Sequence, residues 1–392
     1  MNAQMFLAGR TQFGFGVASK VGEIAKGLRA ERAVLVTDGN MERFGVADRI
    51  EKLLQEAGVE CCVFAGVEPE PSVETTDAVA ELAREHDCQL VVGLGGGSCL
   101  DVAKAVSVLI TNIGSAAQYQ GLNLVKERGV PKILMPTTAG TGSEVTFTAV
   151  LTRKSDGFKG GISDEKLFSD YNLLDPELTL TMPPELTAST GMDALTHALE
   201  AYTGRAASVF SDLFAEEALQ RIGRYLRVAT WNGKDVNARS EMLLASYFGG
   251  VALANAGVGA CHSLAYPLGS MFGVGHGMAS ALLVPYVTAY NALAAPDKYA
   301  GAAALLGFGS EGLPLRDQAF LCAEGLEELV EDLGLPRTLK ELKKRKLIKE
   351  EITAEHLPEL GTKAMAVARP MENNPRSMTV ESCVALYREA ME

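Results

Sequence analysis

Short apolar runs, each ended by a turn, recur through the first half of the chain. They cover residues 33–36, 61–67, 90–94 and 132–136, and helical stretches separate them. Continuous apolar runs of this length are typical of parallel strands that are buried on both faces. Residues 146–162 add a predicted β-hairpin that turns at 154–157, and residues 171–176 add another strand. The first half is therefore predicted to be an α/β domain.

The pattern changes after Pro183-Pro184. Beyond it, apolar residues recur with helical spacing and short connections, over residues 193–202, 211–225, 238–254 and 315–333. This spacing predicts amphipathic or buried helices. The chain is therefore expected to divide into an α/β domain at residues 1–183 and an all-helical domain at residues 184–392.

A glycine loop stands directly after the strand at residues 90–94. The loop reads Gly95-Gly96-Gly97-Ser98, and an apolar helix follows over residues 102–110. Glycines let a backbone approach a pyrophosphate closely, and a helix amino terminus offers unpaired N–H groups to an anion. The loop predicts a phosphate site, and a tight turn that binds nothing is the alternative.

Hydroxyl side chains follow the strand at residues 132–136, in the segment Thr137 to Glu144. Open α/β sheets bind ligands at the carboxyl ends of their strands, so this loop is a second candidate, with a solvated loop as the alternative. Asp38 ends the first strand. An acid there can accept hydrogen bonds from a ribose diol and favours NAD over NADP, although a helix N-cap is equally consistent with it. Because Asp38 precedes the glycine loop, the unit is not the standard dinucleotide fingerprint.

A carboxylate and an imidazole lie one helical turn apart in the predicted helical domain. Asp193 and His197 are four residues apart and share a helix face. His262 and His276 follow in apolar, glycine-rich surroundings, so three of the five histidines can converge with Asp193 on one divalent metal. A single histidine is more often structural, but the set favours a metal site. Pro267 is expected to limit the helix that carries His262, and another helix is expected to begin at His276.

Composition excludes several other classes of function. The 392 residues are 47% hydrophobic and 22% charged, which predicts a folded globular protein. A net charge of −13 argues against a nucleic-acid partner. The sequence shows neither a secretory signal nor an apolar run of about 18–20 residues, the length needed to span a bilayer. Seven scattered cysteines are expected to be buried, reduced thiols, and the expected location is the cytoplasm.

Taken in order, these motifs resemble the iron-dependent (group III) alcohol dehydrogenases, which include lactaldehyde reductase and 1,3-propanediol dehydrogenase. The resemblance covers nearly the whole chain and is carried by Gly95-Gly96-Gly97-Ser98 with Asp101, residues 136–144, residues 191–200, His262 with residues 267–269, and His276-Gly277. It implies a Rossmann-like α/β domain followed by an all-α domain, the dehydroquinate synthase-like architecture, and a homo-oligomer. It also implies a small alcohol or aldehyde as substrate, with no membrane partner.

The resemblance also implies roles for individual residues. The implied metal ligands are Asp193, His197, His262 and His276, with Fe²⁺ as the first choice and Zn²⁺ or Mn²⁺ as alternatives. The implied cofactor, NAD(H) rather than NADP(H), would contact Asp38, Gly95, Gly96, Gly97, Ser98, Asp101, Thr137, Thr138, Thr141, Ser143, Lys159 and Leu178.

The expected reaction is hydride transfer between NAD(H) and a small primary alcohol or aldehyde, with the metal acting as a Lewis acid. A hydroxyacid-oxoacid transhydrogenase that retains its nicotinamide is the first alternative, and a lyase on the same scaffold is the second. His262 and Tyr266 are the candidate catalytic residues. Many members of the family have a histidine at the position of Tyr266, which we expect to orient substrate or water unless it only packs. Arg369 is expected to meet an anionic substrate group or to be a surface arginine.

Overall fold

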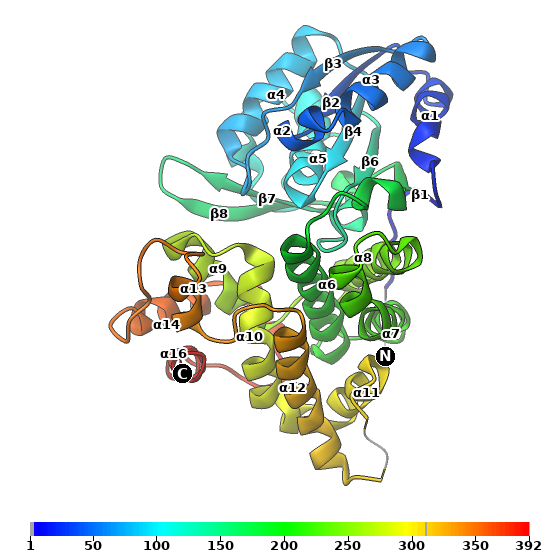
Figure 1. Cartoon of the computed structure of the whole chain (residues 1–392). Helices are drawn as coiled ribbons and strands as arrows, with labels where there is room; N and C mark the ends of the chain where they lie inside the picture. Colours follow the sequence, from blue (N-terminus) through cyan, green and yellow to red (C-terminus); the bar gives the residue numbers. More distant parts are fainter. Residues whose placement is uncertain (1–3, 310–311, 392) are drawn as a thin grey trace. The chain divides into compact units, whose positions relative to one another are not determined.

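The computed structural model describes residues 4–309 and 312–391, and these form two compact units (Figure 1). The α/β unit comprises residues 7–138 and 142–180. The helical unit comprises residues from 181 onward, together with residues 139–141 and the amino-terminal residues up to Phe6. The division after residue 180 precedes the expected boundary at residue 183, and helix α6 begins at Pro184.

The α/β unit is built on a parallel sheet of six strands in the order β1-β9-β6-β4-β2-β3. This confirms the parallel sheet that the apolar runs predict. The strands are β1 Arg10–Phe13, β2 Arg32–Val36, β3 Glu60–Phe64, β4 Leu90–Gly95, β6 Lys132–Pro136 and β9 Tyr171–Leu174. The helices are α1 Val21–Gly27, α2 Gly39–Arg43, α3 Val46–Glu56, α4 Val73–Glu85 and α5 Gly97–Thr111, with short 3-10 turns at Val17–Lys20, Ala116–Tyr119, Ser143–Val145, Glu165–Leu167 and Pro176–Thr179.

Both faces of this sheet are covered. On β2, Val34 and Val36 pack with α4 and α5, whereas Ala33 and Leu35 pack with α1 and α3. Successive strand residues point to opposite faces, so a run without polar positions is stable only between two layers of helices. This explains why the central strands read as continuous apolar runs.

A second, three-stranded sheet belongs to the same unit. Its strands are β5 Gly121–Leu122, β7 Thr148–Arg153 and β8 Phe158–Ser163, in the order β5-β8-β7. β7 and β8 pair antiparallel from Thr148 opposite Ser163 to Arg153 opposite Phe158. The predicted hairpin with its turn at residues 154–157 is therefore confirmed.

The helical unit contains no strand among its described residues, which confirms the all-α prediction. Its helices are α6 Pro184–Thr203, α7 Val209–Trp231, α8 Val236–Ala256, α9 Ala260–Phe272, α10 His276–Asn291, α11 Pro296–Leu306, α12 Leu315–Asp332, α13 Leu339–Lys344, α14 Leu357–Ala366, α15 Ala368–Asn373 and α16 Val380–Glu389, with a 3-10 turn at Ala292–Ala294.

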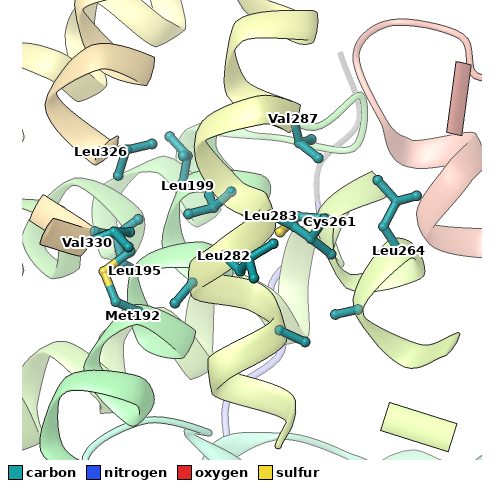
Figure 2. Packing of buried hydrophobic residues seen from close by; sticks show 14 of the residues in the cluster. Met192, Leu195, Leu199, Cys261, Leu264, Leu282, Leu283, Val287, Leu326 and Val330 are labelled. Atoms are coloured by element: carbon teal, nitrogen blue, oxygen red, sulfur yellow. The ribbon is translucent and has the colours of Figure 1, made fainter. Parts of the chain in front are cut away.

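Helix α6 lies in the core of this unit. Figure 2 shows Met192, Leu195 and Leu199 of α6 among the buried side chains of α9, α10 and α12. Every residue from Gly191 to Thr203 is buried. A helix that is buried on all sides is expected to be apolar all round, so the polar residues of α6 need specific partners.

The expectation that Pro267 limits its helix is wrong. Helix α9 continues through Pro267 to Phe272 and ends at Gly273, which has the left-handed φ of +70°. An interior proline removes one backbone hydrogen bond and costs about 3 kcal/mol. Leu264 and Leu268 on either side of the proline are fully buried, and this packing outweighs the local cost.

Within the described part of the chain, no single helix combines the length and the apolar character needed to cross a membrane. Helices α8 and α9 have the necessary length and apolar character only when they are taken together, and the pair is bent by 106°.

Candidate metal centre and glycine loop

Three side chains of the helical unit converge as the sequence predicts. Asp193, His262 and His276 each offer one ligand atom, and these atoms lie within 4.8 Å of one another. The Asp193 Oδ1 atom is 3.5 Å from His276 Nε2 and 4.0 Å from His262 Nε2. Asp193 and His262 are buried, whereas the His276 side chain is 30% exposed. The cluster therefore faces both the core and a more open side.

His197 lies beside this cluster. It follows Asp193 by one turn of α6, and its ring stacks on that of His262 with 4.7 Å between centroids and 23° between planes. The Nδ1 atom of His197 has no hydrogen-bond partner among the described residues. His197 is thus adjacent to the three-residue group rather than within it, and its role as a ligand stays a prediction.

The donor set fits a divalent transition metal. The Nε2 atom of His262 is also buried without a hydrogen-bond partner in the described structure. A buried polar atom without a partner is costly, so this imidazole nitrogen, 4.0 Å from the Asp193 carboxylate, calls for an explanation. A first-row metal ion held by imidazole and carboxylate ligands satisfies such atoms. The Ser280 hydroxyl donates to Asp193 Oδ1 at 3.4 Å and supports the carboxylate.

Glu200 orients His262. Its Oε2 atom accepts from His262 Nδ1 at 2.5 Å, and its Oε1 atom accepts from the Cys261 backbone N–H at 2.6 Å. A proton fixed on Nδ1 leaves Nε2 with its lone pair directed toward Asp193, which is how carboxylates support metal-binding histidines. The sequence analysis assigned Glu200 no role. Its spacing was the available signal, because residues 193, 197 and 200 share one helix face.

Burial and neighbouring charges set the protonation of this cluster. Burial alone would raise the pKa of Asp193, but the adjacent His197, His276 and His262 lower it by more, so the carboxylate is stabilised. Burial lowers the pKa of His197 and favours its neutral, ligating form. For His262, burial acts downward, but the charge and hydrogen bond of Glu200 raise the pKa overall.

Tyr266 lies next to the cluster. It is one turn beyond His262 on α9, is half-buried, and stacks on His276 with 5.4 Å between centroids and 14° between planes. Arg369 is exposed on α15. The structure therefore brings Tyr266 to the candidate centre, and the substrate roles of both residues stay predictions.

The glycine loop joins β4 directly to α5. Gly95 has a φ of +148°, and a Cβ added there would lie 2.5 Å from Cys99 Sγ, so a larger residue does not fit. Gly96 is the N-cap of α5 and supplies no side-chain cap, and no acidic residue occupies the first turn. Within the described residues, no side chain caps the first N–H groups of this 15-residue helix. This arrangement fits a phosphate.

The hydroxyl-rich segment from Thr137 to Glu144, which we call the threonine loop, begins beside the glycine loop. The Thr137 N–H donates to the Gly95 carbonyl at 3.0 Å, which connects the ends of β6 and β4. Thr137 is buried, whereas Thr138 and Thr141 are half-buried. A Cβ added at Gly96 would make an ordinary contact with Thr138 at 3.5 Å. Gly95, Gly96, Thr137 and Thr138 therefore form one surface of the α/β unit.

Asp101 and Ser143 have internal partners. Asp101 Oδ1 accepts from the Ser143 hydroxyl at 2.5 Å, and Oδ2 accepts from the Val150 N–H at 2.9 Å. The fully buried Lys104 pairs with Asp101 at 3.0 Å and donates to the Ser143 carbonyl at 2.9 Å. These contacts fix the threonine loop to α5. Direct contact of Asp101 or Ser143 with a cofactor stays a prediction.

The remaining predicted cofactor residues lie in three places. Asp38 caps α2, because its Oδ1 atom accepts from Asn40 N at 2.8 Å and from Met41 N at 3.2 Å, and its Oδ2 atom accepts from the Cys99 thiol at 3.4 Å. The N-cap alternative is thus observed. Lys159 on β8 pairs with Glu70 at 3.0 Å, and Leu178 is buried in its 3-10 turn. The cofactor roles of Asp38, Lys159 and Leu178 stay predictions.

A parallel α/β unit with a glycine loop, followed by a helical unit with a carboxylate–imidazole cluster, defines a metal-site oxidoreductase. The chain belongs to the iron-containing alcohol dehydrogenase family. Residues 8–176 match the family model for the iron-containing alcohol dehydrogenases, and residues 187–391 match the model for the C-terminal part of the same family. The resemblance and the fold class inferred from the motifs are confirmed.

Individual relatives cover most or all of the chain. Long-chain-alcohol dehydrogenase 1 of Geobacillus thermodenitrificans (strain NG80-2) is 40% identical over 83% of each chain. NAD-dependent methanol dehydrogenase of Bacillus methanolicus is 34% identical over 98% of this chain and 99% of its own. Among solved structures, a 1,3-propanediol oxidoreductase matches with a TM-score of 0.95 at 34% identity and full coverage of both chains. Sulfoacetaldehyde reductase from Bifidobacterium kashiwanohense, in complex with NAD⁺, matches with a TM-score of 0.90 at 30% identity, over 100% of this chain and 99% of its own.

Proposed function

We propose that this chain is a metal-dependent dehydrogenase that transfers a hydride between NAD(H) and a small primary alcohol or aldehyde. The observation that carries the proposal is the convergence of Asp193, His262 and His276, with a buried imidazole nitrogen that lacks a partner within the described structure. Membership of the iron-containing alcohol dehydrogenase family supports the same reaction class.

Asp193, His197, His262 and His276 would hold the metal. When bound, a divalent ion supplies Lewis acidity toward an alcohol or aldehyde oxygen. The residues around the ligands supply orientation. Glu200 keeps the proton of His262 on Nδ1, and Ser280 donates to the Asp193 carboxylate. Asp193 and His262 are also buried, so packing and these hydrogen bonds together restrict the positions of their ligand atoms before an ion binds.

NAD(H) would bind the α/β unit through its phosphates. The uncapped start of α5 and the close approach allowed by Gly95 and Gly96 support this assignment. Two relatives support the choice of NAD, since one is described as NAD-dependent and another is solved with NAD⁺. The cofactor carries the redox chemistry, and the protein aligns it with substrate. Asp38, Thr137, Thr138, Thr141, Lys159 and Leu178 are the further residues proposed for the cofactor site.

Tyr266 is proposed to orient substrate or a water molecule at this centre. Its stacking on His276 places it beside a proposed ligand. Tyr266→Phe keeps the ring and removes the hydroxyl, so the proposal expects a lower kcat or a higher KM with an unchanged metal content. If both kinetic constants stay at their wild-type values, Tyr266 is a packing residue.

An anaerobic assay tests the proposed function. The metal-free protein is reconstituted with Fe²⁺, Zn²⁺ or Mn²⁺. It is assayed with NAD⁺ or NADP⁺ on methanol, longer primary alcohols and 1,3-propanediol, and with NADH or NADPH on the matching aldehydes. Turnover that depends on a metal and prefers NAD(H) to NADP(H) is the expected result. Asp193→Asn is the matched variant, because it keeps the size of the side chain and removes the charge. Absence of turnover in every reconstituted sample would reject the proposal.

Gel filtration distinguishes the alternative reaction. A transhydrogenase retains its nicotinamide and needs a second carbonyl substrate, whereas the proposed enzyme releases NAD(H) and depends on added cofactor. The same column, calibrated for mass, tests the proposed homo-oligomer.

A further inference from the structure

Two cysteines meet at one edge of the sheet in the α/β unit. Cys62 lies on β3, which is the edge strand, and Cys88 lies between α4 and β4. Both pack against the apolar cluster on the α4 and α5 side of the sheet. The neighbouring Cys61 packs against the cluster on the opposite side. Strand alternation therefore separates Cys61 from this pair.

The two thiols are in contact. The Sγ atoms of Cys62 and Cys88 are 3.8 Å apart. The end of α4 fixes the backbone of Cys88, because the Cys88 N–H donates to the Ala83 carbonyl at 2.8 Å and Asp87 adopts a left-handed φ of +46°. The ladder of β3 with β2 fixes Cys62 opposite Val34. A disulfide holds its sulfur atoms about 2.0 Å apart, so the two sulfur atoms must approach each other from 3.8 Å for the bond to form.

The environment gives the two thiols different reactivities. The hydrogen bond between the two thiols lowers the pKa of Cys62 to about 7, and the nearby His86 acts in the same direction. The same contact and burial raise the pKa of Cys88. A thiolate is the nucleophilic form of cysteine, and Cys62 is half-buried whereas Cys88 is buried. Cys62 is therefore the attacking group, and Cys88 is the thiol that completes the bond.

Cys88 also borders the surface. It lines an open hollow of about 520 Å³ together with Arg32, Arg84, Asp87, Gln89 and Ile110. Cys62 is itself half-buried. The hollow carries charges of both signs, because Arg32 pairs with Asp87 at 3.7 Å and Arg84 lies beside them.

We propose that Cys62 and Cys88 form a reversible thiol–disulfide pair that reacts with a low-molecular-weight disulfide of the glutathione type. The Cys62 thiolate attacks one sulfur of the small disulfide, which forms a mixed disulfide and releases one small thiolate. Cys88 then loses its proton to solvent and attacks the Cys62 sulfur, and the second small thiolate leaves. Two protein thiols are oxidised and one small disulfide is reduced to two thiols.

The bond would form away from the glycine loop. Cys88 precedes the first residue of β4, whereas Gly95 ends that strand. Oxidation is therefore expected to cross-link β3 to the turn after α4 without occupying the proposed phosphate site. Cys61 is the internal control, because burial raises its pKa to about 12 and it faces the other side of the sheet.

Peptide mapping tests the proposal. The full chain is incubated anaerobically with oxidised glutathione, the free thiols are blocked, and the protein is digested with trypsin without reduction. The expected product is a linked pair, residues 53–84 with residues 85–104, whose fragmentation places the bond between Cys62 and Cys88. Dithiothreitol should remove it. Cys61→Ser should keep the link, and Cys88→Ala should leave Cys62 as a glutathione mixed disulfide.

Other results would overturn it. A link that joins Cys61 or Cys99, or no link in wild-type protein, excludes the pair as a modification site. Absence of a glutathione adduct on Cys62 in the Cys88→Ala variant excludes Cys62 as the attacking thiol. Circular dichroism accompanies each variant, and Cys88→Ser is the second variant where the alanine does not fold.

Discussion

Replacing Glu200 with glutamine tests whether the hydrogen bond from His262 to Glu200 affects the affinity of the candidate centre for a metal. The carboxylate of Glu200 accepts two hydrogen bonds with different oxygens, from His262 Nδ1 and from the Cys261 N–H. A glutamine of the same size has only one acceptor oxygen. One of the two buried donors must then face an amide NH₂ group, which is itself a donor.

The size of the effect follows from that lost acceptor. A buried donor without a partner costs about 1–3 kcal/mol. The alternative for His262 is to move its proton to Nε2, which removes the lone pair directed toward Asp193. Loss of supporting contacts around metal ligands lowers affinity by about 10–100-fold, which corresponds to about 1.4–2.7 kcal/mol. The two estimates agree, so Glu200→Gln is expected to weaken metal binding by one to two orders of magnitude.

Competition with a chromophoric chelator measures this affinity directly, under anaerobic conditions for Fe²⁺ and in air for Zn²⁺. Glu185→Gln is the matched control, since Glu185 is exposed in the first turn of the same helix. The control should bind metal as the wild type does. A folded Glu200→Gln protein with wild-type affinity would show that Glu200 does not orient His262.

Three further perturbations have defined outcomes. Burial raises the pKa of Glu144 from 4.5 to about 7, so the folded state binds more protons than the unfolded state between these pH values. The free energy of unfolding should therefore fall by up to about 3 kcal/mol as pH rises through that window. Urea unfolding at pH 5 and pH 8 should show this fall in the wild type and not in Glu144→Gln. Lys104→Met leaves Asp101 and the Ser143 carbonyl without their buried cation, so urea unfolding of the α/β unit should lose about 3–5 kcal/mol. Removal of bound metal by a chelator should lower the Tm by calorimetry, and re-addition should restore it, because an ion that binds only the folded state stabilises that state.

The strands and the carboxylate–imidazole cluster were predictable because each leaves a local signal. A strand covered on both faces reads as a continuous apolar run, and β2, β4 and β6 all do so. Asp193 and His197 are one turn apart on α6, and a carboxylate and an imidazole at that spacing on one helix face are a local signal of a metal site. The convergence of His262 and His276 on Asp193 depends on how α9 and α10 pack in the helical unit, and the structure brings the three side chains together.

Other features depend on tertiary contacts that a single sequence does not display. Pro267 reads as a helix end, yet α9 continues because Leu264, Pro267 and Leu268 are buried in the core of the helical unit. Asp101 and Ser143 are indistinguishable in sequence from loop residues that meet a ligand, but a fully buried lysine uses both to fix the loop. Cys62 and Cys88 are separated by a whole helix, and their contact follows from the cap of α4 rather than from any motif.

Helix α6 explains why the helical unit tolerates polar residues in its core. A helix buried from Gly191 to Thr203 would be most stable with apolar residues throughout. Instead it carries Asp193, His197 and Glu200 on one face, and buried imidazole nitrogens beside that face lack partners in the described structure. Burial without partners is unfavourable in the protein alone and becomes favourable when an ion satisfies the same atoms. Asp193, His197 and Glu200 therefore lower the stability of the metal-free protein, and this cost is consistent with a site whose geometry is set before the metal binds.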